Sequence, residues 1–379
     1  MTLKVAHVVR QYLPSVGGME EVVRNVAARQ REVPGHEPRV ITLDRLFRQR
    51  GGGGRLPASD EIEGVAVRRL PFWGSSRYPL CPGVLRALGD ADIVHVHGVD
   101  FFHDFLAVTR PLHRRPLVLS THGGFFHTRF ARRLKTAWFH TVTRTTGRAY
   151  ERVLAVSEGD GERFRGILPA SRIEVIENGV DTQKQADGAS QALQPRLIYF
   201  GRWSSNKGLP ETLNLLRALR ERDPAWRLVI AGRPYDHTEA DLRRRAAEQG
   251  VAEGDALEIV ASPSEEALRG YIGQASYFVG LSGYEGFGIA AIEAMSAGLT
   301  PVLSDIPSFR RLVERAGLGL LGDPALPDAL AERLLEVHAL GEAAYAERRR
   351  AAMAAAEGYA WPRIADQYLR IYERLGGEA

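Results

Sequence analysis

The chain has few of the residues that form disulfides, metal clusters or membrane spans. Its single cysteine, Cys81, excludes an intramolecular disulfide, offers no thiolate cluster to a metal and fits a cytosolic setting. No apolar run approaches the roughly 18 residues that a membrane-spanning helix needs. Residues 1–9 alternate like a strand and lack a small-residue cleavage site, so we expect no signal peptide. These absences favour a cytoplasmic protein.

Lysine is also scarce, and the charges are unevenly distributed. Only four of the 50 basic residues are lysines. Residues 1–185 carry 28 basic and 19 acidic residues, whereas residues 186–379 carry 22 and 27. A basic first half and an acidic second half indicate different partners for the two halves. Chance scatter of solvated charges is the alternative.

The length and the apolar pattern predict two α/β domains. A chain of 379 residues exceeds what one hydrophobic core usually supports. Short runs rich in Val, Ile and Leu alternate with amphipathic helical segments in both halves, which is typical of doubly wound, Rossmann-like domains with parallel sheets. The expected strands are 4–9, 39–43, 65–70, 92–97, 117–120, 153–156, 173–176, 197–200, 228–231, 257–260, 277–279 and 300–303.

A polar stretch at 183–194 lacks periodicity and is expected to link the domains, which would span residues 1–185 and 195–360. Apolar residues at helical spacing predict a final helix over 361–375. Two such domains in series would place the carboxyl ends of two parallel sheets across one cleft, where ligands of open α/β sheets bind.

Two glycines and two cations follow predicted strands. Gly17 and Gly18 come after the first strand and before a helix, where backbone N–H groups can approach an anion, although a plain tight turn explains them equally well. Arg202 stands at the carboxyl end of the expected strand 197–200, and Lys207 follows five residues later. Both would stand at the carboxyl end of a sheet, where a diphosphate needs its charge balanced. The alternative is a solvated loop.

The segment 282–288 gives the strongest signal in the chain. Gly286, Phe287 and Gly288 precede an apolar helix over 289–297, so its first N–H groups are open to a phosphate. Glu285 lies in the loop, and Glu293 lies within the apolar helix, where a carboxylate is costly unless it is hydrogen-bonded. The two hydroxyls of a ribose in a bound ligand would donate hydrogen bonds to this carboxylate. A buried arginine of the protein is the structural alternative.

His122 follows the strand 117–120 and precedes two glycines, a position suited to a binding cleft. Most other histidines should be structural or exposed. We expect no zinc site at His95 and His97, because cysteine or acidic partners at ligand spacing are missing.

Residues 125–150 carry six cations and no acid, with aromatic residues interleaved. This pattern favours a surface that lies on anionic lipid. Nucleic acid would be attracted by the same charges. A solvated helix that packs its aromatic residues inward is the remaining alternative.

Together these segments resemble glycosyltransferase family 4, the retaining enzymes of the GT-B fold, over nearly the whole chain. The strings that carry the resemblance are Arg10-Gln11, 17–21, 120–128, 199–208 and 285–298. They look most like the α-mannosyltransferases of xanthan-type and acetan-type exopolysaccharide assembly. Those enzymes add mannose from GDP-mannose to cellobiosyl-diphosphopolyprenol.

The resemblance implies a role for each candidate residue. Gly17 and Gly18 would lie near the donor phosphate and the acceptor, and His122 would contact the donor sugar and the diphosphate. Arg202 and Lys207 would bind the diphosphate, Glu285 the hydroxyls of the donor sugar and Glu293 the ribose. Backbone groups of Gly286, Phe287 and Gly288 would meet the diphosphate and sugar, and Arg233 the nucleoside. The helix after Trp361 would cross back onto the first domain.

The resemblance further implies catalysis without a metal or other cofactor, since no Asp-x-Asp motif follows a suitable strand. The expected partners are a nucleotide sugar, a lipid-diphosphate-linked oligosaccharide and an anionic membrane surface bound through the first domain, with no nucleic acid. The expected location is the inner face of the cell membrane. UDP-glucose or UDP-galactose as donor, and a non-catalytic binder of sugar nucleotides, are the alternatives.

Overall fold

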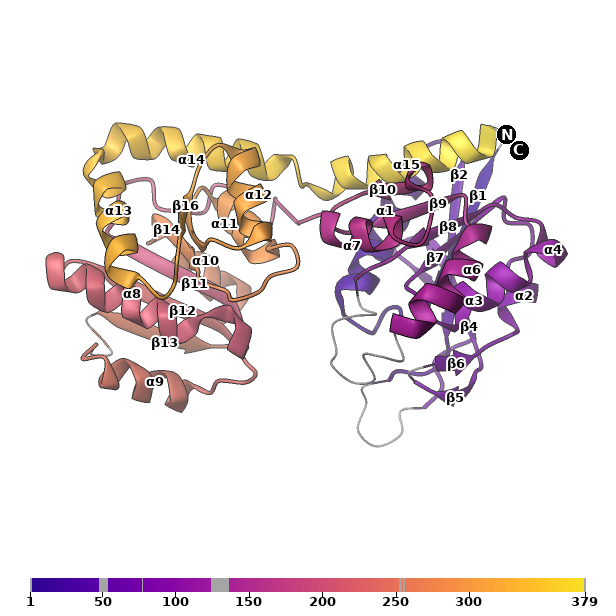
Figure 1. The fold of residues 1–379 in the computed structure, drawn as a ribbon, viewed down its shortest axis with the longest axis horizontal. Helices are drawn as coiled ribbons and strands as arrows, with labels where there is room; N and C mark the ends of the chain where they lie inside the picture. Colours follow the sequence, from indigo (N-terminus) through magenta and orange to yellow (C-terminus); the bar gives the residue numbers. More distant parts are fainter. Residues whose placement is uncertain are drawn as a thin grey trace. The chain divides into compact units, whose positions relative to one another are not determined.

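The computed structural model describes residues 2–47, 54–76, 78–123, 136–251, 254 and 256–377. The chain forms two compact units (Figure 1). Unit 1 comprises Met1–Gly179 with Trp361–Ala379, and unit 2 comprises Val180–Ala360.

Unit 1 is built on one eight-stranded sheet. Its strands are β1 (Leu3–Val9), β2 (His36–Leu43), β3 (Ser59–Ile62), β4 (Val65–Leu70), β7 (Ile93–His97), β8 (Leu117–Ser120), β9 (Arg152–Ala155) and β10 (Ile173–Val175). They lie in the order β10-β9-β8-β7-β1-β2-β4-β3, and every neighbouring pair is parallel except β3 with β4. A separate antiparallel hairpin joins β5 (Trp73–Ser75) to β6 (Tyr78–Leu80).

Helices cover both faces of this sheet (Figure 1). They are α1 (Gly18–Glu32), α2 (Val84–Ala87), α3 (Phe101–Val108), α4 (Arg110–His113), α6 (Arg144–Thr146), α7 (Glu158–Arg165) and α15 (Trp361–Gly377), with a π-helical turn at Phe139–Thr143 and 3-10 turns at Gly147–Ala149 and Ala170–Arg172. The last helix of the chain, α15, therefore belongs to the first unit. Its residue Asp366 accepts a hydrogen bond of 2.9 Å from Arg29 of α1.

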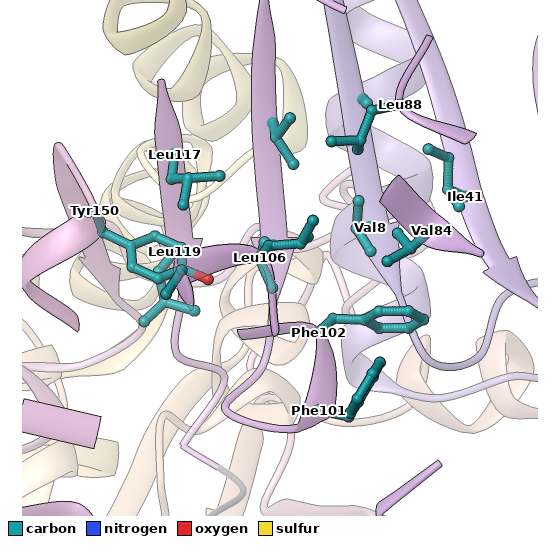
Figure 2. Close-up of a cluster of buried hydrophobic side chains, with 14 of the residues drawn as sticks. Val8, Ile41, Val84, Leu88, Phe101, Phe102, Leu106, Leu117, Leu119 and Tyr150 are labelled. Carbon is teal, nitrogen blue, oxygen red and sulfur yellow. The ribbon is translucent and has the colours of Figure 1, made fainter. Parts of the chain in front are cut away.

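Alternating apolar side chains give unit 1 a core on each face of the sheet. On one face, Val8 and Ile41 pack with Phe102 and Leu106 of α3 (Figure 2). On the other face, Val5 packs against a stripe of α15. Burying one such side chain contributes about 1.5–3 kcal/mol, so the two faces hold the strand ends in fixed positions.

Unit 2 contains a six-stranded sheet in which all pairs are parallel. Its strands are β11 (Arg196–Trp203), β12 (Arg227–Pro234), β13 (Leu257–Ala261), β14 (Tyr277–Gly280), β15 (Thr300–Ser304) and β16 (Leu320–Gly322). Its helices are α8 (Leu209–Arg222), α9 (Glu239–Glu248), α10 (Glu265–Ile272), α11 (Ile289–Ala297), α12 (Pro307–Ala316), α13 (Pro327–Ala339) and α14 (Gly341–Glu357), with a 3-10 turn at Ser205–Lys207.

The strand order of unit 2 is β13-β12-β11-β14-β15-β16. The sheet grows in one direction from β11 to β13 and in the other from β14 to β16, so the order reverses between β11 and β14. Ligands of open α/β sheets bind beyond the carboxyl ends of the strands at such a reversal. The loops after β11 and β14 are therefore the natural binding loops of this unit.

The structure differs from the expected linker at 183–194, because this stretch is packed into unit 2. The Asp187 carboxylate pairs with Arg349 of α14, and the Tyr345 hydroxyl donates a hydrogen bond of 2.7 Å to the Ser190 carbonyl. Ala189 is buried. Unit 2 thus begins at Val180 and not near 195. Side chains of α14, which is distant in sequence, bond to this polar stretch. The composition of the stretch itself does not reveal such contacts.

Candidate active site

Two arginines stand side by side at the carboxyl end of the unit 2 sheet. Arg202 on β11 is the register partner of Arg233 on β12, and both side chains are exposed. The Arg202 guanidinium lies 4.8 Å from the centre of the Tyr235 ring, a cation–π contact that orients it. The arrangement places two permanent positive charges at the carboxyl ends of β11 and β12, and β11 borders the reversal point.

Lys207 and Glu285 connect the loops that follow β11 and β14. Their side chains form an ion pair and a hydrogen bond across the point where the strand order reverses. Asn206 strengthens the link, since its amide donates a hydrogen bond of 3.0 Å to the Tyr284 carbonyl. The structure thus brings together two residues that lie 78 positions apart and that the sequence assigned to the same site.

Two glycines make these loops possible. Gly208 adopts a φ of +65°, and a Cβ there would lie 1.9 Å from the Leu281 carbonyl oxygen. Gly288 caps α11 with a φ of +95°, and a Cβ there would lie 2.8 Å from the Phe309 ring. A larger residue at Gly208 would therefore push the two loops apart, and one at Gly288 would push the start of α11 away from α12.

The amino-terminal end of α11 is suited to an anion. No side chain caps it and its first turn holds no acidic residue, so its positive dipole end is not neutralised by the helix itself. Gly286 is exposed and Phe287 is half-buried just before it. Backbone N–H groups and the cation of Lys207 thus border the same loop.

Glu293 is a half-buried carboxylate on α11. Burial raises its pKa to about 7, an effect that Lys184 opposes and Asp181 adds to. Within the described ranges no hydrogen bond reaches its carboxylate, and the buried Arg349, the kind of partner that the structural alternative required, pairs with Asp187 instead. Burial of a carboxylate without a hydrogen-bond partner from the protein costs free energy, and such groups are typical of ligand-binding sites.

His122 in unit 1 follows β8 in a left-handed backbone conformation, with a φ of +51°. Such a conformation costs a non-glycine residue about 1–2 kcal/mol, and the imidazole is half-buried. Nε2 of His122 lies 3.0 Å from Nδ1 of His97. Burial lowers the pKa of His122 to about 4, so its imidazole is neutral at pH 7.

The loop at Gly17 and Gly18 lies beside two acidic side chains. Gly17 precedes α1 without a side-chain cap, but Glu20 and Glu21 occupy the first turn. The Ser15 hydroxyl donates a hydrogen bond of 2.8 Å to the Glu20 carboxylate. These two acidic side chains add negative charge beside the loop, and its contact with the donor phosphate stays a prediction.

Known proteins with similar sequences identify the family. Residues 16–184 match the protein family described as "Glycosyltransferase Family 4", and residues 181–357 match the family described as "Glycosyl transferases group 1". The GDP-mannose:cellobiosyl-diphosphopolyprenol alpha-mannosyltransferase of Xanthomonas oryzae pv. oryzae is 50% identical over 98% of this chain and 96% of its own. The protein of the same name from Komagataeibacter xylinus is 44% identical over 100% of this chain and 95% of its own.

The chain belongs to glycosyltransferase family 4.

Solved structures confirm the fold of this family 4 chain. A glycosyltransferase from Rickettsia africae matches with a TM-score of 0.74 at 16% identity over 99% of this chain and 98% of that one. HepE from Anabaena, solved with UDP and glucose, matches with a TM-score of 0.68 at 18% identity over 98% and 100%. The chain therefore has the GT-B fold, with two Rossmann-like units.

The two halves of the family 4 candidate site lie in different units. His122, Gly17 and Gly18 belong to unit 1, and the cations and both glutamates belong to unit 2. Their meeting across one cleft stays a prediction.

The basic, aromatic stretch at 125–150 is described only in part, since residues 124–135 lie outside the described residues. Phe139 is buried in the core, so this aromatic ring packs inward. Trp138 is 38% exposed, and Arg144 and Arg148 are exposed.

Sequence reasoning missed the buried side chains behind His122. His7 and His97 are fully buried, and His7 is the register partner of His95 on the adjacent strand. One ring nitrogen from each of His7, His95 and His97 lies within 4.8 Å of the others. Histidines two apart on a strand share one face, which was the available signal, but only the sheet order adds His7 to them.

Proposed function

We propose that this chain is a retaining α-mannosyltransferase that transfers mannose from GDP-mannose to a polyprenyl-diphosphate-linked oligosaccharide, cellobiosyl-diphosphopolyprenol, in exopolysaccharide biosynthesis. The observation that carries the proposal is the identity of 50% and 44%, over nearly the whole chain, to two proteins whose shared name states this donor and this acceptor.

The geometry of unit 2 supports binding of a nucleoside diphosphate sugar. The Glu293 carboxylate, which has no hydrogen-bond partner among the residues that the structure describes, would accept hydrogen bonds from the ribose hydroxyls, which would offset the cost of its burial. Arg202, Lys207 and the uncapped start of α11 would balance the diphosphate charge. Glu285, next to Lys207, would accept hydrogen bonds from hydroxyls of the sugar. Arg233 would lie near the nucleoside.

The transfer would exchange one bond at the anomeric carbon for another. The bond to the diphosphate oxygen breaks, and the bond to the acceptor oxygen forms on the same face of the sugar. The acceptor proton moves to the departing diphosphate, so no protein nucleophile is needed. Fixed cations and helix N–H groups at the diphosphate stabilise the charge that develops there, and this role requires no metal.

A panel of donors with a polyprenyl-diphosphate disaccharide tests the proposal, with the product analysed by mass and linkage. We expect turnover with GDP-mannose and an α-linked product. Turnover with UDP-glucose or UDP-galactose but not with GDP-mannose would refute the donor assignment. Binding of GDP-mannose without transfer to any acceptor would instead favour a non-catalytic binding protein.

Exposed aromatic and apolar side chains support a further part of the proposal, attachment of unit 1 to an anionic membrane. In the β5–β6 hairpin, Trp73 is 64% exposed and Leu80 is 43% exposed. The Tyr78 ring of this hairpin lies 6.4 Å from the Trp138 ring, and Arg144, further along the same stretch of chain as Trp138, is exposed. Aromatic rings beside cations suit the interface of an anionic bilayer. No helix in the described ranges is both long and apolar enough to cross a membrane.

Sedimentation with vesicles of phosphatidylglycerol and phosphatidylcholine tests the attachment. We expect Trp73→Ala to weaken binding and added salt to weaken it further, since charge attraction is screened over about 10 Å at 0.1 M salt. Leu326→Ala is the control, because this side chain of unit 2 is 58% exposed. Binding that ignores salt, anionic lipid and Trp73 would contradict the proposal.

A further inference from the structure

Four side chains of unit 1 form a continuous hydrogen-bonded chain that ends at His122. The Gln30 Oε1 atom on α1 lies 3.1 Å from Nε2 of His7, and Nδ1 of His7 lies 3.2 Å from Nε2 of His97. Nδ1 of His97 lies 3.0 Å from Nε2 of His122. Gln30, His7 and His97 are fully buried, so bulk water does not compete for these bonds.

The direction of the hydrogen bonds follows from the orientation of the Gln30 amide, which places Oε1 against His7 and leaves Nε2 buried without a hydrogen-bond partner among the described residues. A neutral imidazole has one N–H, and an amide oxygen only accepts. His7 therefore donates from Nε2 to Gln30, and its Nδ1 accepts from His97. His97 in turn accepts from Nε2 of His122, which leaves a lone pair on Nδ1 of His122. Among the described residues no group bonds to that nitrogen.

Electrostatics keep the three imidazoles neutral, as this order requires. Burial lowers the pKa of His7 and of His122 to about 4, and it lowers that of His97 well below the ordinary value. Turning the Gln30 amide by 180° would reverse every bond in the chain. One buried amide therefore decides whether His122 presents a lone pair or an N–H group.

We propose that Gln30, acting through His7 and His97, holds His122 in the tautomer whose Nδ1 accepts a hydrogen bond from a substrate hydroxyl. The three are positioning residues, because none of them is exposed to a ligand. The part that concerns a substrate rests on the proposed function. The tautomer itself does not.

A neighbouring pair supplies a matched control. The His95 ring lies 4.0 Å from the His97 ring, but its two nitrogens bond to Tyr372 and Ser120, at 2.6 and 2.9 Å. His95 thus shares the buried cluster without being a link in the chain. Tyr372→Phe removes one buried hydrogen bond, as a change at Gln30 does, and leaves the chain intact.

Nitrogen NMR of the full-length protein with labelled histidine reads each tautomer directly. We expect Nε2 of His122 to be protonated and Nδ1 unprotonated, with the signal assigned through His122→Gln. Gln30→Met should give a mixture of tautomers at His122, whereas Tyr372→Phe should not. Should Gln30→Met fail to fold, His7→Phe breaks the same chain at the next link. A protonated Nδ1, or an unchanged His122 in the folded variant, would overturn the proposal.

Kinetics then separate the tautomer from the function. Gln30→Met should lower kcat about tenfold, roughly the loss of one hydrogen bond to the substrate. The affinity for guanosine should stay unchanged, because the groups proposed to bind the nucleoside belong to unit 2. A normal tautomer without turnover of any donor would refute the proposed function alone. One equivalent of Zn²⁺ bound by His7, His95 and His97 would overturn the chain, since the metal would take its nitrogens.

Discussion

Glu293→Gln should stabilise the protein while it abolishes nucleotide binding. The Glu293 carboxylate is half-buried without a hydrogen-bond partner in the described residues, and burial raises its pKa to about 7 from an ordinary value of 4.5. Glutamine has the same shape but no charge to desolvate. The folded protein then no longer has to hold a buried carboxylate above pH 7.

The size of the effect follows from proton linkage. Because the pKa is higher in the folded than in the unfolded chain, the folded chain binds the proton more tightly. Its free energy of unfolding is therefore greatest below about pH 4.5 and falls as the pH rises through 7. The gap between 4.5 and about 7 corresponds to about 3 kcal/mol at pH 8, and to less than about 1 kcal/mol at pH 5.

Thermal unfolding with and without GDP measures both consequences. For a unit of this size, about 3 kcal/mol corresponds to roughly 6–12 °C, so Glu293→Gln should raise Tm by about that much at pH 8 and by little at pH 5. GDP should raise the Tm of the wild type and not that of the variant. Glu347→Gln, an exposed position on α14, is the control. A gain that is equal at both pH values, or a lower Tm at pH 8, would refute the reasoning.

Three further results are expected. Gly208→Ala should lower the free energy of unfolding of unit 2 by more than about 2 kcal/mol, because its φ is +65° and a Cβ would strike a carbonyl oxygen. The control Gly286→Ala has open space around it and should change that free energy by no more than about 0.5 kcal/mol. Equal unfolding midpoints of the two variants in urea would contradict the prediction. Lys207→Met should weaken GDP binding about 10–100-fold in calorimetry and leave guanosine binding unchanged, since only the diphosphate meets the ammonium. Excess EDTA should leave the turnover of GDP-mannose unchanged, and a loss restored by Mg²⁺ or Mn²⁺ would contradict a metal-independent reaction.

Much of the architecture could be predicted from the sequence because parallel strands buried on both faces are continuous apolar runs. The strands expected at 65–70 and 117–120 match β4 and β8, and the helix expected at 289–297 matches α11. The short strands β3, β5, β6 and β16 were missed. β3 and β5 are largely exposed, so they show no apolar run that a periodicity test can find.

Candidate site residues could be picked out from the sequence where their chemistry is local, and not where it depends on sheet order. The glycines beside Glu285 and the apolar residues around Glu293 lie within a few positions of these glutamates, so the sequence alone marks both as candidates. The acidic start of α1 is likewise visible in the sequence, at Glu20 and Glu21. His7 lies 90 residues from His97, and only the pairing of β1 with β7 brings them together.

The path of α15 has a consequence for how this protein is made. The helix supplies Ile364, Tyr368 and Tyr372 to a core that otherwise consists of residues from the first half of the chain. During synthesis, unit 2 has its whole sequence available before unit 1 does, so the half translated first is completed last. Removing the carboxyl-terminal 19 residues would therefore expose the interior of the opposite half, and an isolated fragment of residues 1–179 would lack one wall of its own core.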